Sequence, residues 1–180
     1  MKKRDVLFIC VTAAGVALFV VLSLCLQVPV FENYYLCLGY VAMAVFCYSF
    51  GAAGGMAVGV LGVVLYCLLI NGLRGMPGWA LGNGLIGLVL GIVFGRIRGM
   101  EKKGLKYLTA AAAIFLSVTA GILGVKSLTE SLLYTQPLLL RVGKNVYAWV
   151  ADLVVLLISL PICEIIHPAI RKMFPDLVKE

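Results

Sequence analysis

Between Glu32 and Arg96 the chain has a run of 63 residues in which Arg74 is the one charged side chain. The rest of this run consists almost wholly of Leu, Val, Gly, Ala, Ile and aromatic residues. A soluble domain cannot bury so much apolar sequence, because a large part of any globular surface faces water and is kept in solution by charged residues. The run therefore indicates a protein whose solvent is lipid.

Apolar tracts long enough to cross a bilayer recur along the whole chain. A bilayer core about 30 Å thick requires about 20 apolar residues in a helix, and six tracts can be marked off. They run over residues 5–27, 35–50, 51–71, 78–97, 105–126 and 146–168. With 63% hydrophobic and 13% charged residues, we expect an all-α membrane protein in which residues 1–180 form a single integral membrane domain, a bundle of six transmembrane helices.

The positions of Lys and Arg predict the orientation of this bundle. Positive residues in short loops stay on the cytoplasmic side, and eleven of the fifteen lie before the first span, between the fourth and fifth, or after the sixth. An even number of spans puts both termini on one side, so we expect cytoplasmic N- and C-termini in a cell membrane. The formal net charge of +7 is accounted for by this topology and requires no nucleic-acid partner.

Two of the expected spans carry Gly at every fourth position, which places the glycines on one helical face and lets helix backbones approach closely. The glycines predicted to pack helix against helix are Gly51, Gly55 and Gly59 in the third span, and Gly87, Gly91 and Gly95 in the fourth. The first span has a milder version of this pattern in Ala13 and Ala17. The alternative is that Gly and Ala are simply common in membrane helices.

Motifs for nucleotide, metal or catalytic chemistry are weak. Residues 82–87 match G-x-G-x-x-G, but they lie inside an apolar span and lack the preceding strand that dinucleotide binding requires. The pair Lys126-Ser127 lacks the preceding Gly of a phosphate-binding loop, and the six Cys show no C-x-x-C spacing. His167 follows Glu164 by three residues without the further ligands that a metal needs. We expect no enzyme, no metal and no cofactor, and any ATP hydrolysis would be the work of another subunit.

The polar residues that remain within the spans gather toward the outer end of the bundle. Asn145, Trp149 and Asp152 share one face of the sixth span, and Trp79 and Asn83 lie one turn apart in the fourth. An ionisable group at that depth must face protein or a watery cavity, because exposure to lipid costs up to about 3 kcal/mol. These five side chains suit a pocket for a small aromatic or polar ring. The alternative for the two Trp residues is a place in the interfacial aromatic belt.

The longest stretch outside the expected spans is 126–144. Long ordered loops are often functional, so this stretch is a candidate for a lid over the pocket.

Residues 11–22, 40–62 and 78–91, together with N-x-x-x-W at Asn145 and Trp149, are similar to the S components of energy-coupling factor (ECF) vitamin transporters, in particular the riboflavin-type group. The resemblance implies a six-helix substrate-binding subunit of a bacterial cell membrane. It implies a vitamin-like ligand, with a riboflavin-like heterocycle as the leading candidate, and as partners a transmembrane coupling subunit and two ATPase subunits. The family's docking pattern falls on Ala13 and Ala17, and its pocket positions fall near the five polar residues named above.

A non-transporting membrane scaffold of the MreD cell-shape type is the main alternative, since it has a similar size and number of spans. A scaffold would need no outward pocket. A vacant polar chamber would therefore favour the carrier, and a chamber filled by side chains would favour the scaffold.

Overall fold

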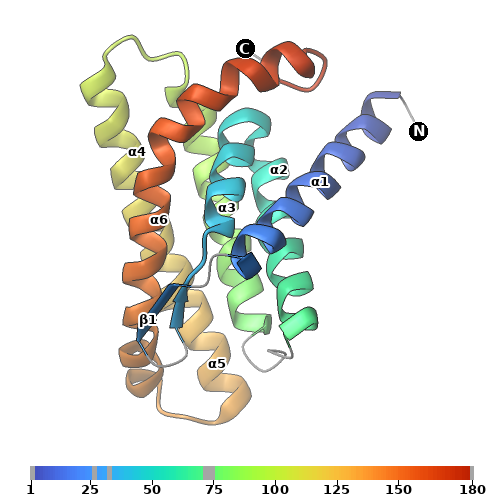
Figure 1. The fold of residues 1–180 in the computed structure, drawn as a ribbon. Coiled ribbons are helices and arrows are strands. Elements are labelled where there is room, and N and C mark those ends of the chain that lie inside the picture. The colour runs from blue at the N-terminus through green and yellow to red at the C-terminus, as the bar shows by residue number, and fades with distance from the viewer. Residues whose placement is uncertain (1–2, 26–27, 32–33, 71–75, 179–180) are drawn as a thin grey trace.

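The computed structural model describes residues 3–25, 28–31, 34–70 and 76–178, and most of them are helical (Figure 1). The elements follow in the order α1 (Lys3–Cys25), β1 (Val28–Phe31), β2 (Tyr34–Leu36), α2 (Gly39–Ile70), α3 (Met76–Ile97), α4 (Lys103–Val118), the π-helix η1 (Thr119–Lys126), α5 (Ser127–Tyr134) and α6 (Leu138–Met173). Within this part of the chain, five helical segments are long and apolar enough to cross a membrane, namely α1, α2, α3, the continuous stretch Lys103–Tyr134 and α6. The expected multi-pass helical architecture is confirmed, and the number of crossings depends on α2.

Gly51 interrupts α2 with a φ of 75° and a ψ of −160°. A positive φ of this kind is accessible to Gly at little cost and strains other residues. A Cβ added at Gly51 would meet no atom within 4 Å. Gly51 therefore serves the backbone conformation, and its carbonyl carbon also lies 2.6 Å from a Cβ added at Gly91 of α3, so its predicted role in helix packing stays a prediction.

The two arms of α2, residues 39–50 and 52–70, run antiparallel. A Cβ added at Gly55 would collide with Cys47, and one at Gly59 would lie 2.6 Å from the Sδ of Met43. Residues equally distant from the break thus face each other, and the break falls where two separate spans were predicted to meet. At 1.5 Å per residue the first arm is about 18 Å long, shorter than a bilayer core of about 30 Å, so six full crossings stay a prediction.

The fourth-position glycines of α3 pack at two of their three positions. A Cβ added at Gly87 would lie 2.8 Å from the backbone of Gly55, and one at Gly91 would overlap the backbone of Ala52. At Gly95 an added Cβ would meet only an Arg98 nitrogen, at 3.9 Å. The predicted packing role of Gly95 is therefore wrong, because α3 has passed its contact with the second arm of α2 by this turn.

A short antiparallel hairpin of β1 and β2 joins α1 to α2, with Val28 paired to Leu36. The hairpin is a short departure from helix in a chain that otherwise has the expected all-α class. The segment around Pro29 is too short to form a helix. The two short strands instead pair their backbone N–H and C=O groups with each other.

The chain from 103 to 173 differs from the expected span–loop–span order. Residues 127–134 are helical and α6 begins at Leu138, so a long loop over 126–144 is wrong. Only residues 135–137 separate α5 from α6, with Thr135 in the left-handed region at a φ of 52°. Residues Leu138–Leu140 extend the apolar sequence of α6 toward its N-terminus, so α6 begins earlier than the predicted span over 146–168.

Large apolar side chains remain exposed on every long helix, for example Leu61 (51%), Leu81 (57%), Leu116 (65%) and Ile158 (59%). Such a surface suits lipid and not water. Both termini point toward one end of the bundle, whereas the hairpin and α5 lie at the other (Figure 1). We call these the termini end and the hairpin end; the cytoplasmic location of the termini stays a prediction.

Candidate functional site

A buried polar cluster around Tyr40 joins α2, α3 and α6 toward the hairpin end. The Tyr40 hydroxyl lies 2.7 Å from Asn83 Oδ1 and 2.8 Å from Asp152 Oδ2, and Trp79 Nε1 donates to it at 3.0 Å. Tyr40 and Asn83 are fully buried, and Asp152 is 4% exposed. Three of the five predicted binding residues thus meet, and the residue that joins them was not predicted.

Proton counting shows that this cluster has spare hydrogen-bonding capacity. The Tyr40 hydroxyl has one proton, so it donates to either Asn83 or Asp152 at one time. Asn83 Nδ2 has no partner among the described residues although it is buried. Leaving a buried donor unpaired costs about 1–3 kcal/mol, so an acceptor atom supplied by a ligand would be stabilising here.

The aromatic wall of the cluster is formed by Trp79 and Tyr66. Their ring centroids lie 5.7 Å apart in an edge-to-face arrangement. Trp79 therefore combines a packed ring with a fixed N–H donor, which is what a site for a planar ligand requires.

A second buried polar cluster lies where η1, α5 and α6 meet. Asn145 Oδ1 accepts from Lys126 Nζ at 3.0 Å, and Asn145 Nδ2 lies 3.0 Å from Ser127 Oγ and 3.1 Å from Glu130 Oε2. Glu130 also faces Lys126 at 4.0 Å and Arg141 at 3.7 Å. The predicted residue Asn145 therefore belongs to an ion-pair network, away from the Tyr40 hydroxyl.

Trp149 is placed apart from both clusters. Its Nε1 donates to Thr119 Oγ1 at 2.9 Å, and its ring meets Phe115 edge-to-face at 5.7 Å. Phe115 is 50% exposed, so Trp149 faces the α4 side of the bundle. Of the predicted set, Trp79, Asn83 and Asp152 come together, whereas Asn145 and Trp149 do not join them.

Several residues of these clusters were not predicted from sequence, and Tyr40, Lys126 and Glu130 are those that make the most contacts within them. Lys126 and Glu130 were assigned to a loop, but opposite charges four residues apart are the spacing of a helical ion pair, and that signal could have found them. Tyr40 stands among apolar residues and gave no signal of its own.

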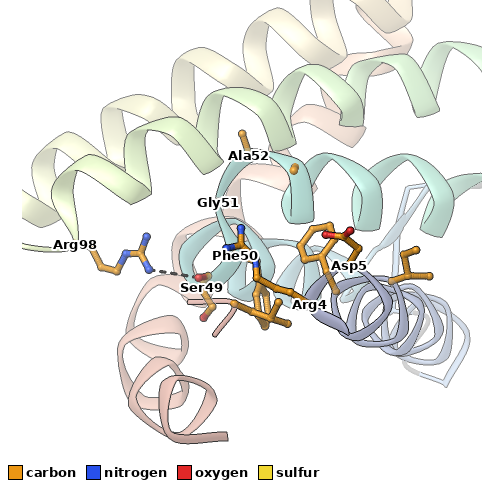
Figure 2. Close-up of a pocket in the computed structure, with 11 residues that line it drawn as sticks. Arg4, Asp5, Ser49, Phe50, Gly51, Ala52 and Arg98 are labelled. Atoms are coloured by element: carbon orange, nitrogen blue, oxygen red, sulfur yellow. Dashed lines mark hydrogen bonds between the residues drawn. The ribbon is translucent and has the colours of Figure 1, made fainter. Parts of the chain in front are cut away.

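Two hollows in the described part of the chain lie at the termini end. One of about 590 Å³ is lined by residues that include Arg4, Asp5, Ser49 and Arg98, and Figure 2 shows these side chains around the Gly51 break. At the hairpin end the space between Trp79, Asn83 and Asp152 is occupied by the Tyr40 side chain. Tyr40 therefore lies where the vacant chamber was expected, and its hydroxyl contacts the polar atoms that were expected to line that chamber.

The part of the chain that the structure describes contains no group of three or more His, Cys, Asp or Glu side chains that could hold a metal ion. The chemistry available in the two clusters is hydrogen bonding and ion pairing, which suits binding.

Residues 4–167 match the family model described as the S component of the ECF-type riboflavin transporter. The chain belongs to this S-component family. The family is one of membrane transporter components and not of enzymes, and the long apolar helices of the structure agree with a multi-pass membrane protein.

Curated bacterial relatives match about half of this S-component chain. A UPF0397 protein of Lactococcus lactis subsp. cremoris (strain NZ9000) is 35% identical over 94 residues, which cover 51% of this chain and 50% of that protein. A UPF0397 protein of Streptococcus thermophilus (strain ATCC BAA-491 / LMD-9) is 31% identical over 96 residues, 53% of this chain and 52% of that protein. The UPF0397 protein YdcD of Lactococcus lactis subsp. lactis (strain IL1403) is 36% identical over 93 residues, 50% of each. The chain spans about half the length of the curated relatives that it matches.

Proposed function

We propose that the protein is the substrate-capture subunit of an ECF-type importer in a bacterial cell membrane. It binds a vitamin or related micronutrient from outside and delivers it inward with a transmembrane coupling subunit and two ATPase subunits. The observation that carries the proposal is the buried cluster of Tyr40, Trp79, Asn83 and Asp152 inside a chain of the S-component family.

The chemistry of the cluster favours a planar heterocycle. Asp152 offers an acceptor and Asn83 Nδ2 an unpartnered donor, so together they suit a ring edge that carries an N–H beside a carbonyl oxygen or a ring nitrogen. The edge of a flavin ring has an N–H between two carbonyl groups. A riboflavin-like heterocycle therefore stays the leading candidate, with Trp79 as the aromatic wall.

Ligand binding at this cluster requires that the Tyr40 side chain moves. This side chain is fully buried, and its hydroxyl contacts Asn83 Oδ1 and Asp152 Oδ2, the second of which is the acceptor that the ligand would use. We infer that Tyr40 turns aside as the ligand arrives, and that α5 and the 135–137 turn, held to α6 by the Asn145 network, act as the gate. In this scheme Asn145 and Trp149 contribute to the closed form around the ligand.

The first helix supplies the proposed docking surface for the coupling subunit. Ala13 and Ala17 are exposed, whereas Gly15 on the opposite face is buried against the ring of Phe46. A smooth face of small residues lets a second helix approach closely. The buried face holds α1 on α2 while the exposed one remains for the partner.

One observation favours the alternative of a scaffold, namely that the buried Tyr40 hydroxyl already contacts Trp79, Asn83 and Asp152. The family match favours the carrier. The two differ in what they retain on purification, because a scaffold has no use for a small ligand.

The deciding experiment is to purify the full chain and to identify any small molecule that is retained, by absorbance and mass spectrometry, followed by titration with riboflavin. A yellow preparation, or saturable riboflavin binding that Asp152→Asn weakens, supports the proposal. A preparation that retains no heterocycle and binds no riboflavin or other vitamin in the same titration would contradict it.

A further inference from the structure

A second polar region of the molecule lies at the termini end, outside the site described above. A hollow of about 530 Å³ lies between the end of α3, the start of α4 and the last turns of α6. Its charged lining consists of four cations, Arg98, Lys103, Lys106 and Arg171, and two carboxylates, Glu101 and Glu164. We call this hollow the cationic groove.

One of the two carboxylates is already neutralised. Glu164 forms an ion pair with Lys106 at 2.7 Å and accepts a hydrogen bond from the Tyr107 hydroxyl at 2.6 Å. Setting this pair aside, the groove presents Arg98, Lys103 and Arg171 against Glu101. Arg98 and Lys103 flank the turn between α3 and α4, and the fold adds Arg171 from the last turn of α6.

Arg98 is held in the wall of the groove. Its Nη1 donates to the backbone oxygen of Ser49 at 3.3 Å. Burial lowers the pKa of the Arg98 guanidinium, and the positive charge of Arg171 lowers it further, although Tyr48 acts in the opposite direction. Two guanidinium groups that repel each other across a hollow are stabilised by an anion between them. Guanidinium groups bind phosphate oxygens with particular specificity, through parallel N–H donors.

The surroundings of the groove indicate which source of phosphate fits. Apolar side chains on the same ends of α4 and α6 are exposed: Leu105 (48%), Leu108 (68%) and Ile165 (76%). A phospholipid joins a phosphate to acyl chains, so it can place the phosphate in the groove and the chains against these residues. Basic pockets between transmembrane helices bind anionic headgroups in this way.

We propose that the cationic groove binds the phosphate of an anionic phospholipid headgroup, with the acyl chains along the exposed apolar side chains of α4 and α6. The proposal goes beyond substrate capture and does not depend on it, because the groove and the Tyr40 cluster lie at opposite ends of the bundle.

Lipid retention by the purified full chain tests the proposal. The chain is incubated in detergent with an equimolar mixture of phosphatidylglycerol and phosphatidylcholine, and retained lipids are counted by native mass spectrometry. The groove variant is the double substitution Lys103→Gln with Arg171→Gln. The matched control is Lys102→Gln with Lys172→Gln, which removes the same charge from neighbouring positions that do not line the groove. All four positions are exposed, so neither variant removes a buried contact of the fold.

We expect the unmodified chain to retain phosphatidylglycerol in preference to phosphatidylcholine. The groove variant should lower that preference about tenfold, and the control less than about twofold. An equal loss in both variants, or no loss in either, would overturn the proposal, since the first would mean diffuse surface charge and the second no site. Displacement of phosphatidylglycerol by inorganic phosphate alone would also overturn it, by showing a site for a soluble anion.

Discussion

The two ends of the helix bundle treat polar side chains in opposite ways. At the hairpin end, Tyr40, Asn83 and Asp152 are buried and hydrogen-bonded to one another. At the termini end, Lys103 and Arg171 stay exposed beside an open hollow. Buried polar groups without water must find protein partners or pay a desolvation cost, whereas groups at the interface are satisfied by water and headgroups. Polarity inside the membrane-spanning part is therefore the stronger indicator of a specific site.

The comparison also separates neutral from charged recognition. The Tyr40 cluster contains the carboxyl group of Asp152, together with the amide of Asn83, the indole of Trp79 and the phenol of Tyr40. This set of groups suits a planar neutral ligand. The cationic groove suits an anion. Five sets of substitutions test this difference between the two ends, in order of decreasing effect.

Complete loss of transport is expected when a bulky residue is placed on the exposed face of α1. Ala13→Trp or Ala17→Trp should abolish uptake and leave ligand affinity unchanged, because the indole keeps a partner helix from approaching. Radiolabelled vitamin uptake in cells and ligand titration of the purified variant give the two readouts. If ligand binding is lost together with uptake, the face of α1 that carries Ala13 and Ala17 belongs to the core of the bundle, and the prediction of a docking surface is wrong.

A large loss of affinity is expected at the hairpin end when its carboxylate is removed. Asp152→Asn keeps the shape but weakens a charge-assisted hydrogen bond to the ligand, so affinity should fall about thirtyfold. Glu164→Gln is the matched control, since it removes a carboxylate from the other end of α6 and should change affinity less than about twofold. Titration calorimetry measures both, and equal effects would mean that the ligand does not lie at the Tyr40 cluster.

The two tryptophans test how far the site at the hairpin end extends. Trp79→Ala should weaken binding about tenfold or more, because it removes both the ring and the donor to Tyr40. If Trp149 closes over the bound ligand, Trp149→Ala should also weaken binding about tenfold. Fluorescence titration distinguishes the cases. Unchanged affinity for Trp149→Ala would return this residue to the interfacial belt and confine the site to the Tyr40 cluster.

Breaking the buried ion pair at the hairpin end should cost stability. Glu130→Ala removes the carboxylate that faces Lys126 and Arg141 and accepts from Asn145, and should destabilise the fold by about 3 kcal/mol. Glu101→Ala, at the exposed termini end, should change stability by less than about 0.5 kcal/mol. Thermal unfolding in detergent measures both, and a neutral Glu130→Ala would show that water reaches this cluster. The double variant Lys126→Met with Glu130→Leu should recover part of the loss, since it removes the most buried cation of the network together with the carboxylate.

The smallest expected effect distinguishes two glycines of α3. Gly91→Ala should destabilise the bundle by about 1–3 kcal/mol, because the new methyl group overlaps the backbone of Ala52. Gly95→Ala meets only the end of Arg98 and should be neutral or slightly stabilising through its higher helix propensity. Thermal unfolding again gives the comparison, and equal values for both would mean that α3 does not pack on the second arm of α2 at Gly91.

Part of the site could be predicted because its signals are local. Trp79 and Asn83 stand out as polar residues in an apolar helix, and Asp152 stands out for the same reason, so each was found from sequence alone. Tyr40 was not found, since the hydrogen bonds that define its role cross 43 and 112 positions of sequence. Helical periodicity gives the face on which a side chain lies, but not the helix that the face will meet.

Length, apolar composition and glycine are properties of single segments, so the sequence alone predicted the lipid solvent of this protein, most of its helical spans and the break near Gly51. The packing of the bundle decided that the Tyr40 hydroxyl lies between Asn83 and Asp152, that Asn145 joins Lys126 and Glu130, and that Arg171 meets Arg98 and Lys103 in one groove. The physical reason is that each of these depends on which helix faces come together, and packing of the whole bundle selects them.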